Sequence, residues 1–297
     1  MPTRSVVFEG RILPLLLLAP QLLILLVFFF WPAGQALVQA VFLVDAFGGN
    51  AQFVGLANFR ELFASREYLY ALQVTAIFTV ATTALAVGLG LVLALAVERL
   101  RWSASIYRTL LIWPYAVAPA VAGVLFMFLL NPSIGVLAFA LNRGLGFNWD
   151  PTLNRLDGMI LVVVASAWKQ VSYNFVFFLT GLMAIPRPVI EAAALDGAGP
   201  IARIRHVILP LLSPTTFFLV VVNIVYAFFE TFGVVHTTTG GGPAGSTTIL
   251  VYKIYRDGFV GLDLGLSSAQ SVIMMIIVTG LTVLQFRFVE RRVHYGS

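Results

Sequence analysis

Six long apolar runs constrain the fold of this chain more than any other feature. Each is long enough to cross the hydrocarbon core of a bilayer, which takes about 20 helical residues. Unpaired backbone amides are costly in lipid, and the alternating pattern of a membrane-barrel strand is absent, so each run is predicted to be helical. The runs are Ile12–Trp31, Tyr70–Val97, Ile106–Leu130, Gly158–Ala184, Leu211–Val235 and Leu266–Val289. The sequence therefore predicts an all-α integral membrane protein with six transmembrane helices in a single domain, residues 1–297.

The composition excludes a water-soluble domain of this size. Of the 297 residues, 60% are hydrophobic and only 10% are charged, too few to cover the surface of a soluble fold. Arg4 and Arg11 precede the first run, as they would in a secretory signal. The apolar stretch is too long for a signal, however, and no small-residue cleavage site follows it, so we expect this run to be retained as a span.

Lysine and arginine are distributed unevenly between the two sides of the predicted membrane. Eleven of the 18 lie on the side of both termini, six lie on the other side, and Lys169 lies within a run. Because cytoplasmic segments are enriched in these residues, the N- and C-termini are predicted to be cytoplasmic. The longer links, residues 32–69, 131–157 and 236–265, are then the outer loops. The basic charge is an orientation signal, and we expect no nucleic-acid partner.

Two outer loops carry local patterns. In "FVGLANFRELF", Phe59, Leu62 and Phe63 share one helical face, which predicts a short helix that lies at the lipid interface or packs on the protein. Both alternatives stay open. The stretch "TTTGGGP" (237–243) is expected to be a flexible loop, and a plain turn is favoured over a surface that receives a partner.

The third run contains two prolines. Pro114 and Pro119 lack the backbone N–H that a helix interior requires, so the sequence predicts a kink in this span. A kink is first a structural feature and second a candidate hinge.

The motifs of catalysis and metal binding are absent from the sequence. There is no cysteine, and neither of the two lysines, Lys169 and Lys253, follows a glycine, which excludes a phosphate-cradling P-loop. His206, His236 and His294 are not at metal-ligand spacing. We therefore expect no catalytic residue, metal site or cofactor in this chain. Any work it performs must draw energy from a partner or from an ion gradient.

Residues 185–210 form a compact polar insert between the fourth and fifth runs. Pro186 and Pro188 end the fourth run, and Glu191 is predicted to lie in the first turn of a short helix, where a carboxylate favours the positive end of the dipole. Gly197 is suited to close that helix in a left-handed conformation. A second helix then leads through Leu209 and Pro210 into the fifth run. The alanine-rich face suits docking to a protein, and an amphipathic elbow on the lipid surface is equally compatible with these residues.

This insert resembles the cytoplasmic EAA loop of ATP-binding-cassette (ABC) importer permeases. The usual isoleucine of the motif is Val207 here, a mild departure. The resemblance implies a coupling helix that sits in a cleft of a separate ATPase subunit. The implied coupling residues are Glu191, Ala192, Ala193, Asp196, Gly197, Leu209 and Pro210.

The resemblance extends over nearly the whole chain. It is carried by "IWPYAVAPAVAG" (112–123), "WKQVSYNFVFF" (168–178), "VNIVYAFFETFGV" (222–234) and "VYKIYRDGFVGLDLG" (251–265). These segments are similar to the A-type permeases of glycerol-3-phosphate importers, in the carbohydrate-uptake branch that also holds the maltose systems. The resemblance implies a type I importer permease in the bacterial inner membrane. It also implies four partner subunits: a second homologous permease, an ATPase homodimer that binds ATP and Mg, and a periplasmic substrate-binding protein.

Polar side chains inside the fourth and fifth runs are candidates for contact with cargo. A charge at the bilayer centre costs roughly 2.5–3.5 kcal/mol, so charged residues there are usually functional. The candidates for the substrate path are Lys169, Tyr173, Asn174, Asn223, Tyr226 and Glu230. Lys169 would meet an anionic phosphate. The structural alternative is that Lys169 and Glu230 pair inside the bundle or reach the interface by snorkelling.

The cargo implied by the resemblance is glycerol-3-phosphate or a related glycerophosphodiester. A permease for a neutral sugar or oligosaccharide in the same family is an alternative. An ion-coupled secondary transporter that uses Lys169 and Glu230 as a relay is a weaker one, because the six runs show no evident inverted repeat. The last alternative is a membrane scaffold without transport activity.

Overall fold

The computed structural model describes residues 12–44, 51–98 and 104–288. The chain divides into two compact units. The first unit contains the residues up to Ala64 together with Asp257–Ile273, and the second contains Ser65–Arg256 and the residues from Met274 onward.

The first unit begins with one long apolar helix. α1 (Ile12–Leu25) continues through a π-helical turn (Leu26–Phe30) into α2 (Trp31–Gln39). The predicted end of this span at Trp31 is wrong, because the alanine, leucine and glutamine residues that follow favour helix although they are less apolar. The predicted loop 32–69 therefore starts in helical structure.

A β-hairpin and a short helix complete the N-terminal part of this unit. β1 (Phe42–Val44) pairs antiparallel with β2 (Ala51–Phe53), a small departure from the predicted all-α fold. In α3 (Ala57–Ala64), Asn58 donates hydrogen bonds of 3.0 Å each to the carbonyls of Ala40 and Phe42. Leu62 of this helix is 1% exposed. The helix therefore follows the alternative in which it packs on the protein.

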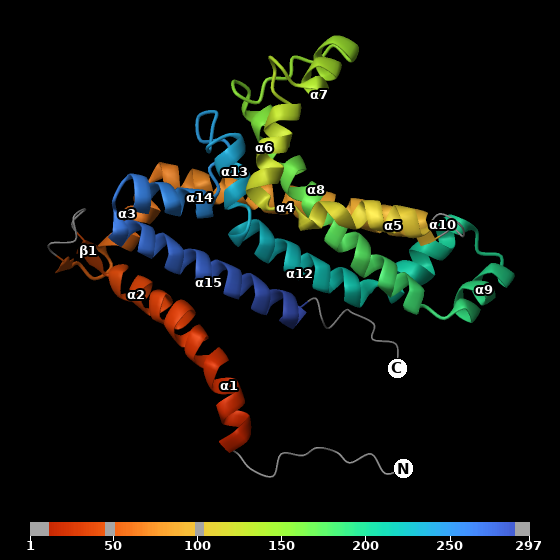
Figure 1. Cartoon of the computed structure of the whole chain (residues 1–297), viewed down its shortest axis with the longest axis horizontal. Coiled ribbons are helices and arrows are strands. Elements are labelled where there is room, and N and C mark those ends of the chain that lie inside the picture. Colours follow the sequence, from red (N-terminus) through yellow and green to blue (C-terminus); the bar gives the residue numbers. More distant parts are fainter. Residues whose placement is uncertain (1–11, 45–50, 99–103, 289–297) are drawn as a thin grey trace. The chain divides into compact units, whose positions relative to one another are not determined.

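The second unit is built on two long helices, α4 (Arg66–Glu98) and α8 (Arg155–Ala184), that lie side by side (Figure 1). They approach closely where Gly90 meets α8, since a Cβ at Gly90 would lie 2.6 Å from the Cβ of Asn174. α12 (Ser213–Phe229) packs against both helices. Large apolar side chains such as Phe78 on α4 and Phe175 on α8 are fully buried, in two separate apolar clusters.

The predicted third span is broken rather than kinked. α5 (Ala104–Ile112) runs into a 3-10 turn (Trp113–Ala116), and α6 (Pro119–Leu129) leaves at an angle of 103°. Ala118 is extended because it precedes Pro119, which starts the new helix. The predicted proline effect is therefore confirmed, and its size exceeds a kink.

The predicted fifth span is also shorter than expected. α12 begins at Ser213 after a bend of 68° and ends at Phe229, and α13 (Phe232–Thr238) follows as a separate helix packed on α6. The predicted end of the run Leu211–Val235 is thus wrong, whereas its predicted start lies two residues from the start of α12. Among the described residues, four helices are long and apolar enough to cross a membrane, or six if each bent pair is one span.

The remaining elements belong to the predicted outer loops, except α15 (Leu264–Phe288), which corresponds to the predicted sixth span Leu266–Val289. Trp149 anchors residues 131–157, because its indole Nε1 donates to the Leu130 carbonyl at 2.9 Å. Asn142 brackets the backbone of Trp149 with two hydrogen bonds of 2.7 and 3.3 Å. The elements are α7 (Val136–Phe139), a π-helical turn (Ala140–Gly144), α14 (Leu250–Tyr255), a π-helical turn (Arg256–Val260) and α15 (Leu264–Phe288).

Residues 238–249, which we call the threonine loop, are tightly bonded. The hydroxyls of Thr239 and Thr247 lie 2.6 Å apart, and Thr248 donates to the Gly241 carbonyl at 3.0 Å. Ile249 at its end is 1% exposed. The expectation of a flexible loop is wrong, because the hydroxyls replace water as partners for the glycine-rich backbone.

Candidate functional site

A cavity of about 330 Å³ opens between the broken third span, α8 and α12. It is lined on one side by valines of α12 and on the other by polar and aromatic residues. The lining residues are Tyr115, Lys169, Gln170, Tyr173, Val221, Val222, Val225, Tyr226 and Glu230. Four of the six predicted path residues therefore lie around one space.

Lys169 lies at the wall of this cavity, over the ring of Tyr115. Its Nζ lies 5.6 Å from the centroid of the Tyr115 ring, and the rings of Tyr115 and Tyr173 are 5.5 Å apart. A cation over a ring face is attracted by the ring quadrupole, by about 0.5–2 kcal/mol depending on desolvation. The aromatic contact stabilises the ammonium group without neutralising its charge.

Glu230 also lines the cavity, and it is the C-cap residue of α12. Its side chain is exposed. Among the described residues no salt bridge joins it to Lys169. The pairing alternative is thus not what this structure shows, and each charge faces the cavity separately.

Asn174 and Asn223 lie elsewhere, contrary to the prediction. Both are 0% exposed, and their amide groups exchange hydrogen bonds of 2.8 and 3.2 Å across the contact of α8 with α12. Each amide also donates to a carbonyl of its own helix. Because a buried amide needs partners, the two side chains satisfy one another and join the helices instead of facing the cavity.

Sequence reasoning missed Tyr115 and Gln170. Tyr115 enters the cavity because the chain breaks around it, between Pro114 and Pro119. The signal was present, since a tyrosine between two span-breaking prolines is turned out of a helical array. Gln170 follows Lys169 and is a polar residue within a span, which is itself a functional indicator.

The insert that follows α8 forms a helical hairpin, residues 187–211, which we call the EAA hairpin. α9 (Arg187–Leu195) is closed by Gly197, whose φ of +84° is left-handed. The Gly197 N–H donates to the Ala194 carbonyl at 3.1 Å, and the Ala198 N–H donates to that of Ala193 at 3.0 Å. These two bonds form a Schellman motif, which confirms the predicted role of Gly197 as the closing residue.

Two details of the hairpin differ from the prediction. α9 starts at Arg187, so Glu191 lies in its second turn, beyond the strongest part of the helix dipole. The second arm is continuous from α10 (Pro200–Arg203) through a π-helical turn (Ile204–Ile208) to α11 (Leu209–Leu211). Leu209 and Pro210 therefore belong to the hairpin, and α12 begins after them.

The hairpin has one packed face and one open face. Ile190 and Ile208 pack against the apolar core around Phe178. On the other face Leu195 is 89% exposed and Ile201 is 81% exposed. Large apolar side chains with this exposure are typical of a surface that a partner covers.

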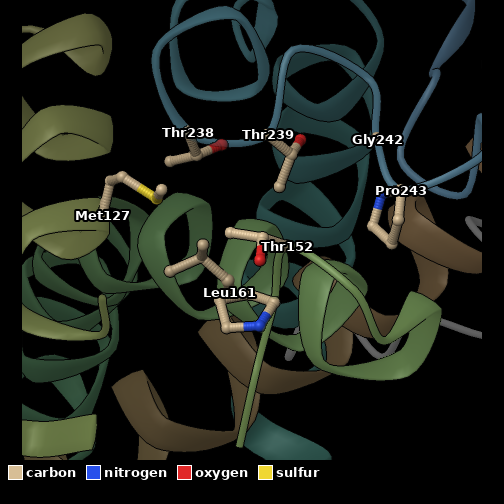
Figure 2. A pocket seen from close by; sticks show the side chains of 8 residues that line it. Met127, Thr152, Leu161, Thr238, Thr239, Gly242 and Pro243 are labelled. Atoms are coloured by element: carbon tan, nitrogen blue, oxygen red, sulfur yellow. The ribbon is translucent and has the colours of Figure 1, made fainter. Parts of the chain in front are cut away.

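A smaller cavity of about 130 Å³ lies beside the threonine loop (Figure 2). Figure 2 shows Thr238 and Thr239 above Thr152 and Leu161, with Met127 of α6 on one side. No cluster of three or more His, Asp or Glu suited to a metal occurs in the described part of the chain.

Comparison with known proteins defines the class of this chain. Residues 86–295 match the family of binding-protein-dependent transport system inner membrane components, and the chain belongs to that family. It is therefore a permease subunit of an ABC importer in the inner membrane, a transport subunit and not an enzyme. The resemblance seen in the sequence motifs is confirmed.

Several relatives are similar over almost their full length. The sn-glycerol-3-phosphate transport system permease protein UgpA of Rhizobium meliloti (strain 1021) is 60% identical over 293 residues, which cover 99% of this chain and 100% of the relative. UgpA of Agrobacterium fabrum (strain C58) is 56% identical with the same coverage. UgpA of Yersinia pseudotuberculosis is 53% identical over 97% of this chain and 98% of its own.

The fold is shared with solved ABC transporters. A chain in the crystal structure of a bacterial alginate ABC transporter, in complex with an alginate pentasaccharide-bound periplasmic protein, superposes with a TM-score of 0.80. The superposition covers 96% of both chains at 20% sequence identity. The chain therefore has the type I importer permease fold.

Proposed function

We propose that this chain forms half of the translocation path of an importer for glycerol-3-phosphate or a related glycerophosphodiester. The observation that carries the proposal is the cationic Lys169 at the wall of a cavity within the helix bundle, without a carboxylate partner among the described residues. The name shared by the curated relatives supports the same cargo.

The cavity has the chemistry to accept a phosphorylated polyol. Lys169 supplies the positive charge, and in a site shielded from water this charge attracts phosphate more strongly than it would in bulk solvent. Tyr115, Tyr173 and Gln170 line the same space with hydroxyl and amide groups suited to the glycerol moiety. Tyr226 closes one wall, where its hydroxyl donates to the Ser166 carbonyl at 3.4 Å.

The EAA hairpin is proposed to transmit ATPase motion to this cavity. Its exposed apolar face would seat in a cleft of the ATPase, while Ile190 and Ile208 hold the other face on the helix bundle. The proposed docking residues include the motif positions Glu191, Ala192, Ala193, Asp196 and Gly197. The rigid closure of α9 suits this role, because a rigid element transfers movement without absorbing it.

The proposed assembly and topology follow from the charge distribution and the family. The chain crosses the membrane six times, each bent helix pair forms one span, and both termini are cytoplasmic. Residues 131–157 and 236–265 face the periplasm. The proposed partners are a second homologous permease, an ATPase homodimer and a periplasmic substrate-binding protein. ATP and Mg bind to the ATPase, and this chain holds no cofactor.

Uptake by the reconstituted full complex tests the cargo. In Lys169→Gln the loss of the charge is expected to reduce glycerol-3-phosphate uptake by about tenfold or more, the effect of removing a charge-assisted hydrogen bond. Lys169→Arg, which keeps the charge, should retain part of the uptake. Arg155→Gln, an exposed change at the start of α8, is the matched control. Equal loss of uptake, complex assembly and basal ATP hydrolysis in Lys169→Gln would instead assign Lys169 a structural role.

The second candidate is a neutral sugar or oligosaccharide, favoured by the aromatic wall of the bundle. The ring of Tyr173 lies 4.7 Å from that of Phe177, which lies 5.2 Å from that of Phe218. Apolar sugar faces pack on such rings. Uptake of labelled maltose exceeding that of glycerol-3-phosphate, and unaffected by Lys169→Gln, would favour this candidate.

A further inference from the structure

The hydrogen-bonded pair of Asn174 and Asn223 lies at the same turns of α8 and α12 as the lining of the Lys169 cavity. Asn174 follows the lining residue Tyr173 on α8, and Asn223 follows the lining residue Val222 on α12. Successive residues on a helix point about 100° apart, so one of each two faces the cavity while the other faces the neighbouring helix. The pair is therefore a polar contact between the two helices that adjoins the cavity wall.

The pair uses all the N–H groups of its two amides. Each amide donates one hydrogen bond to the other asparagine, at 3.2 and 2.8 Å, and one to a carbonyl of its own helix, at 2.8 and 2.7 Å. Both side chains are 0% exposed, so bulk water does not reach them. A slide of α12 by one helical turn, about 5.4 Å, would break both bonds between the helices. The pair therefore fits one register of α12 against α8.

Apolar packing around the pair does not specify this register by itself. Phe175 follows Asn174, the Leu219 carbonyl accepts from Asn223, and both apolar side chains are buried in one cluster. Apolar burial is non-directional, whereas a buried amide needs its partner at a fixed distance and angle. Single buried polar residues set the register of helices in coiled coils by this means. The asparagine pair supplies the same directional constraint between α8 and α12.

Two neighbouring contacts connect the pair to the rest of the bundle and to the cavity wall. A Cβ at Gly90 of α4 would lie 2.6 Å from the Cβ of Asn174, so α4 packs directly against this asparagine. Tyr226, which lines the cavity, donates from its hydroxyl to the Ser166 carbonyl of α8 at 3.4 Å. α12 is thus bonded to α8 through the pair and through a residue of the cavity wall. A change of register would move that wall relative to Lys169.

We propose that Asn174 and Asn223 are positioning residues for the transport step. Their amide pair fixes the register of α12 against α8, and it thereby sets how the valine and tyrosine side chains of α12 face Lys169 across the cavity. Neither asparagine touches the cargo. That the cavity binds cargo, and which cargo it binds, rests on the proposed function. The register constraint rests on the hydrogen bonds and the burial of the pair alone.

Leucine substitutions in the reconstituted full complex test this role, because leucine is close to asparagine in size and shape but forms no side-chain hydrogen bond. Uptake of labelled glycerol-3-phosphate and ATP hydrolysis are measured together, with binding protein and cargo saturating. The deciding quantity is the cargo delivered per ATP hydrolysed, because this ratio does not depend on the fraction of complexes that fold. In Asn174→Leu, Asn223→Leu and the double variant, the ratio is expected to fall about threefold or more, the scale of weakening one hydrogen bond to the cargo.

The double variant separates positioning from stability. Each single variant leaves one buried amide without its partner and should unfold at a lower temperature, whereas replacing both partners by apolar groups should restore much of the stability. A positioning role predicts that the ratio stays low in the double variant although stability returns. Asn142→Leu, which removes two hydrogen bonds to the Trp149 backbone outside the cavity, is the matched control. It should lower stability and leave the ratio unchanged.

Three results would overturn the proposal. A wild-type ratio in the double variant would mean that the pair only stabilises the fold, and a wild-type ratio in both single variants would mean that the register is fixed without it. An equal fall of the ratio in Asn142→Leu would remove the link to the cavity. The proposed function fails separately: a complex that carries no glycerol-3-phosphate removes that cargo, and the ratio is then measured with labelled maltose or another cargo that the complex carries.

Discussion

The EAA hairpin and the threonine loop both connect helices, but the side chains of the loop are buried and hydrogen-bonded, whereas the hairpin exposes large apolar side chains. In the threonine loop, Thr247 is 1% exposed, and its hydroxyl donates to the Gly242 carbonyl at 2.8 Å. In the EAA hairpin, Leu195 and Ile201 are 89% and 81% exposed. The threonine loop is packed and hydrogen-bonded within this chain. The EAA hairpin presents an apolar surface of the kind that a partner covers.

The difference shows where a permease subunit keeps its own stability and where it depends on its assembly. Substitutions in the threonine loop should change the stability of the folded chain. Substitutions on the open face of the EAA hairpin should change partner binding and leave stability almost unaltered. Four predictions are ordered from the largest expected effect to the smallest. Two concern the EAA hairpin, one the bridge at the end of the threonine loop, and one the segment 131–157.

Leu195→Asp should have the largest effect. A charge on the exposed apolar face is expected to cost 2 kcal/mol or more of partner binding, roughly a 30-fold loss, as at interface hot spots. Retention of the ATPase during purification and ATP-driven uptake measure the effect. Leu153→Asp, a change at a leucine that is 80% exposed in another loop, is the control for ATPase retention. Full retention of the ATPase in Leu195→Asp would show that the hairpin docks through other residues.

Thr75→Val should destabilise the chain without affecting ATPase retention. The substitution removes the bridge to the Leu250 N–H and the Ala71 carbonyl, leaving a buried donor unpaired at a cost of about 1–3 kcal/mol. Thermal unfolding of the purified complex measures it. Thr180→Val, which removes an exposed hydroxyl bonded to the Val176 carbonyl, should change stability by less than about 0.5 kcal/mol. Equal shifts in the two variants would contradict the separation.

Gly197→Ala should loosen the end of α9. An L-residue with a φ of +84° is strained by about 1 kcal/mol, which favours opening of the Schellman motif. Faster hydrogen exchange of the Ala198 amide would report this opening. Gly199→Ala is the matched control, because its φ is −67° and a Cβ there meets nothing within 4 Å. Unchanged exchange in Gly197→Ala would show that the turn tolerates a side chain.

The smallest expected effect concerns Asp150 in the segment 131–157. The hydroxyl of Thr152 donates to its carboxylate at 2.5 Å, and this bond, together with backbone donors, lowers the pKa of Asp150. A lowered folded-state pKa means that the stabilisation is present above the ordinary value and is lost as pH falls through the lowered one. Fluorescence of the adjacent Trp149, followed through an acid titration, should show a transition that is absent in Asp150→Asn. A transition that persists in this variant would have another origin.

At the EAA hairpin, the sequence predicted both the motif and the turn that closes α9. The spacing of Glu191, Ala192, Ala193 and Gly197 is local, and the turn that closes α9 depends on residues within one stretch of chain. The Lys169 cavity was predicted in part, because a charge within an apolar run stands out. The threonine loop was mispredicted, since its bonds are local but its burial depends on packing against distant helices.

The errors share one physical cause. Asn174 and Asn223 are 49 positions apart, and nothing in either run reveals that they exchange hydrogen bonds instead of facing the cavity. Tyr115 lies in the cavity because the third span bends by 103°. The prolines predict that this span bends, but they do not predict the angle. The sequence shows which residues of a span are polar. The packing of the neighbouring helices decides what each polar side chain faces.

The sequence by itself determined that this chain is helical and belongs in a membrane, that it carries the EAA motif, and that Lys169 is a charge within a span. These are properties of composition, periodicity and short-range spacing. Only the tertiary structure decided which polar groups face a cavity and which satisfy one another. The direction of each side chain depends on helix contacts between residues far apart in the chain, and no single segment of the sequence contains this information.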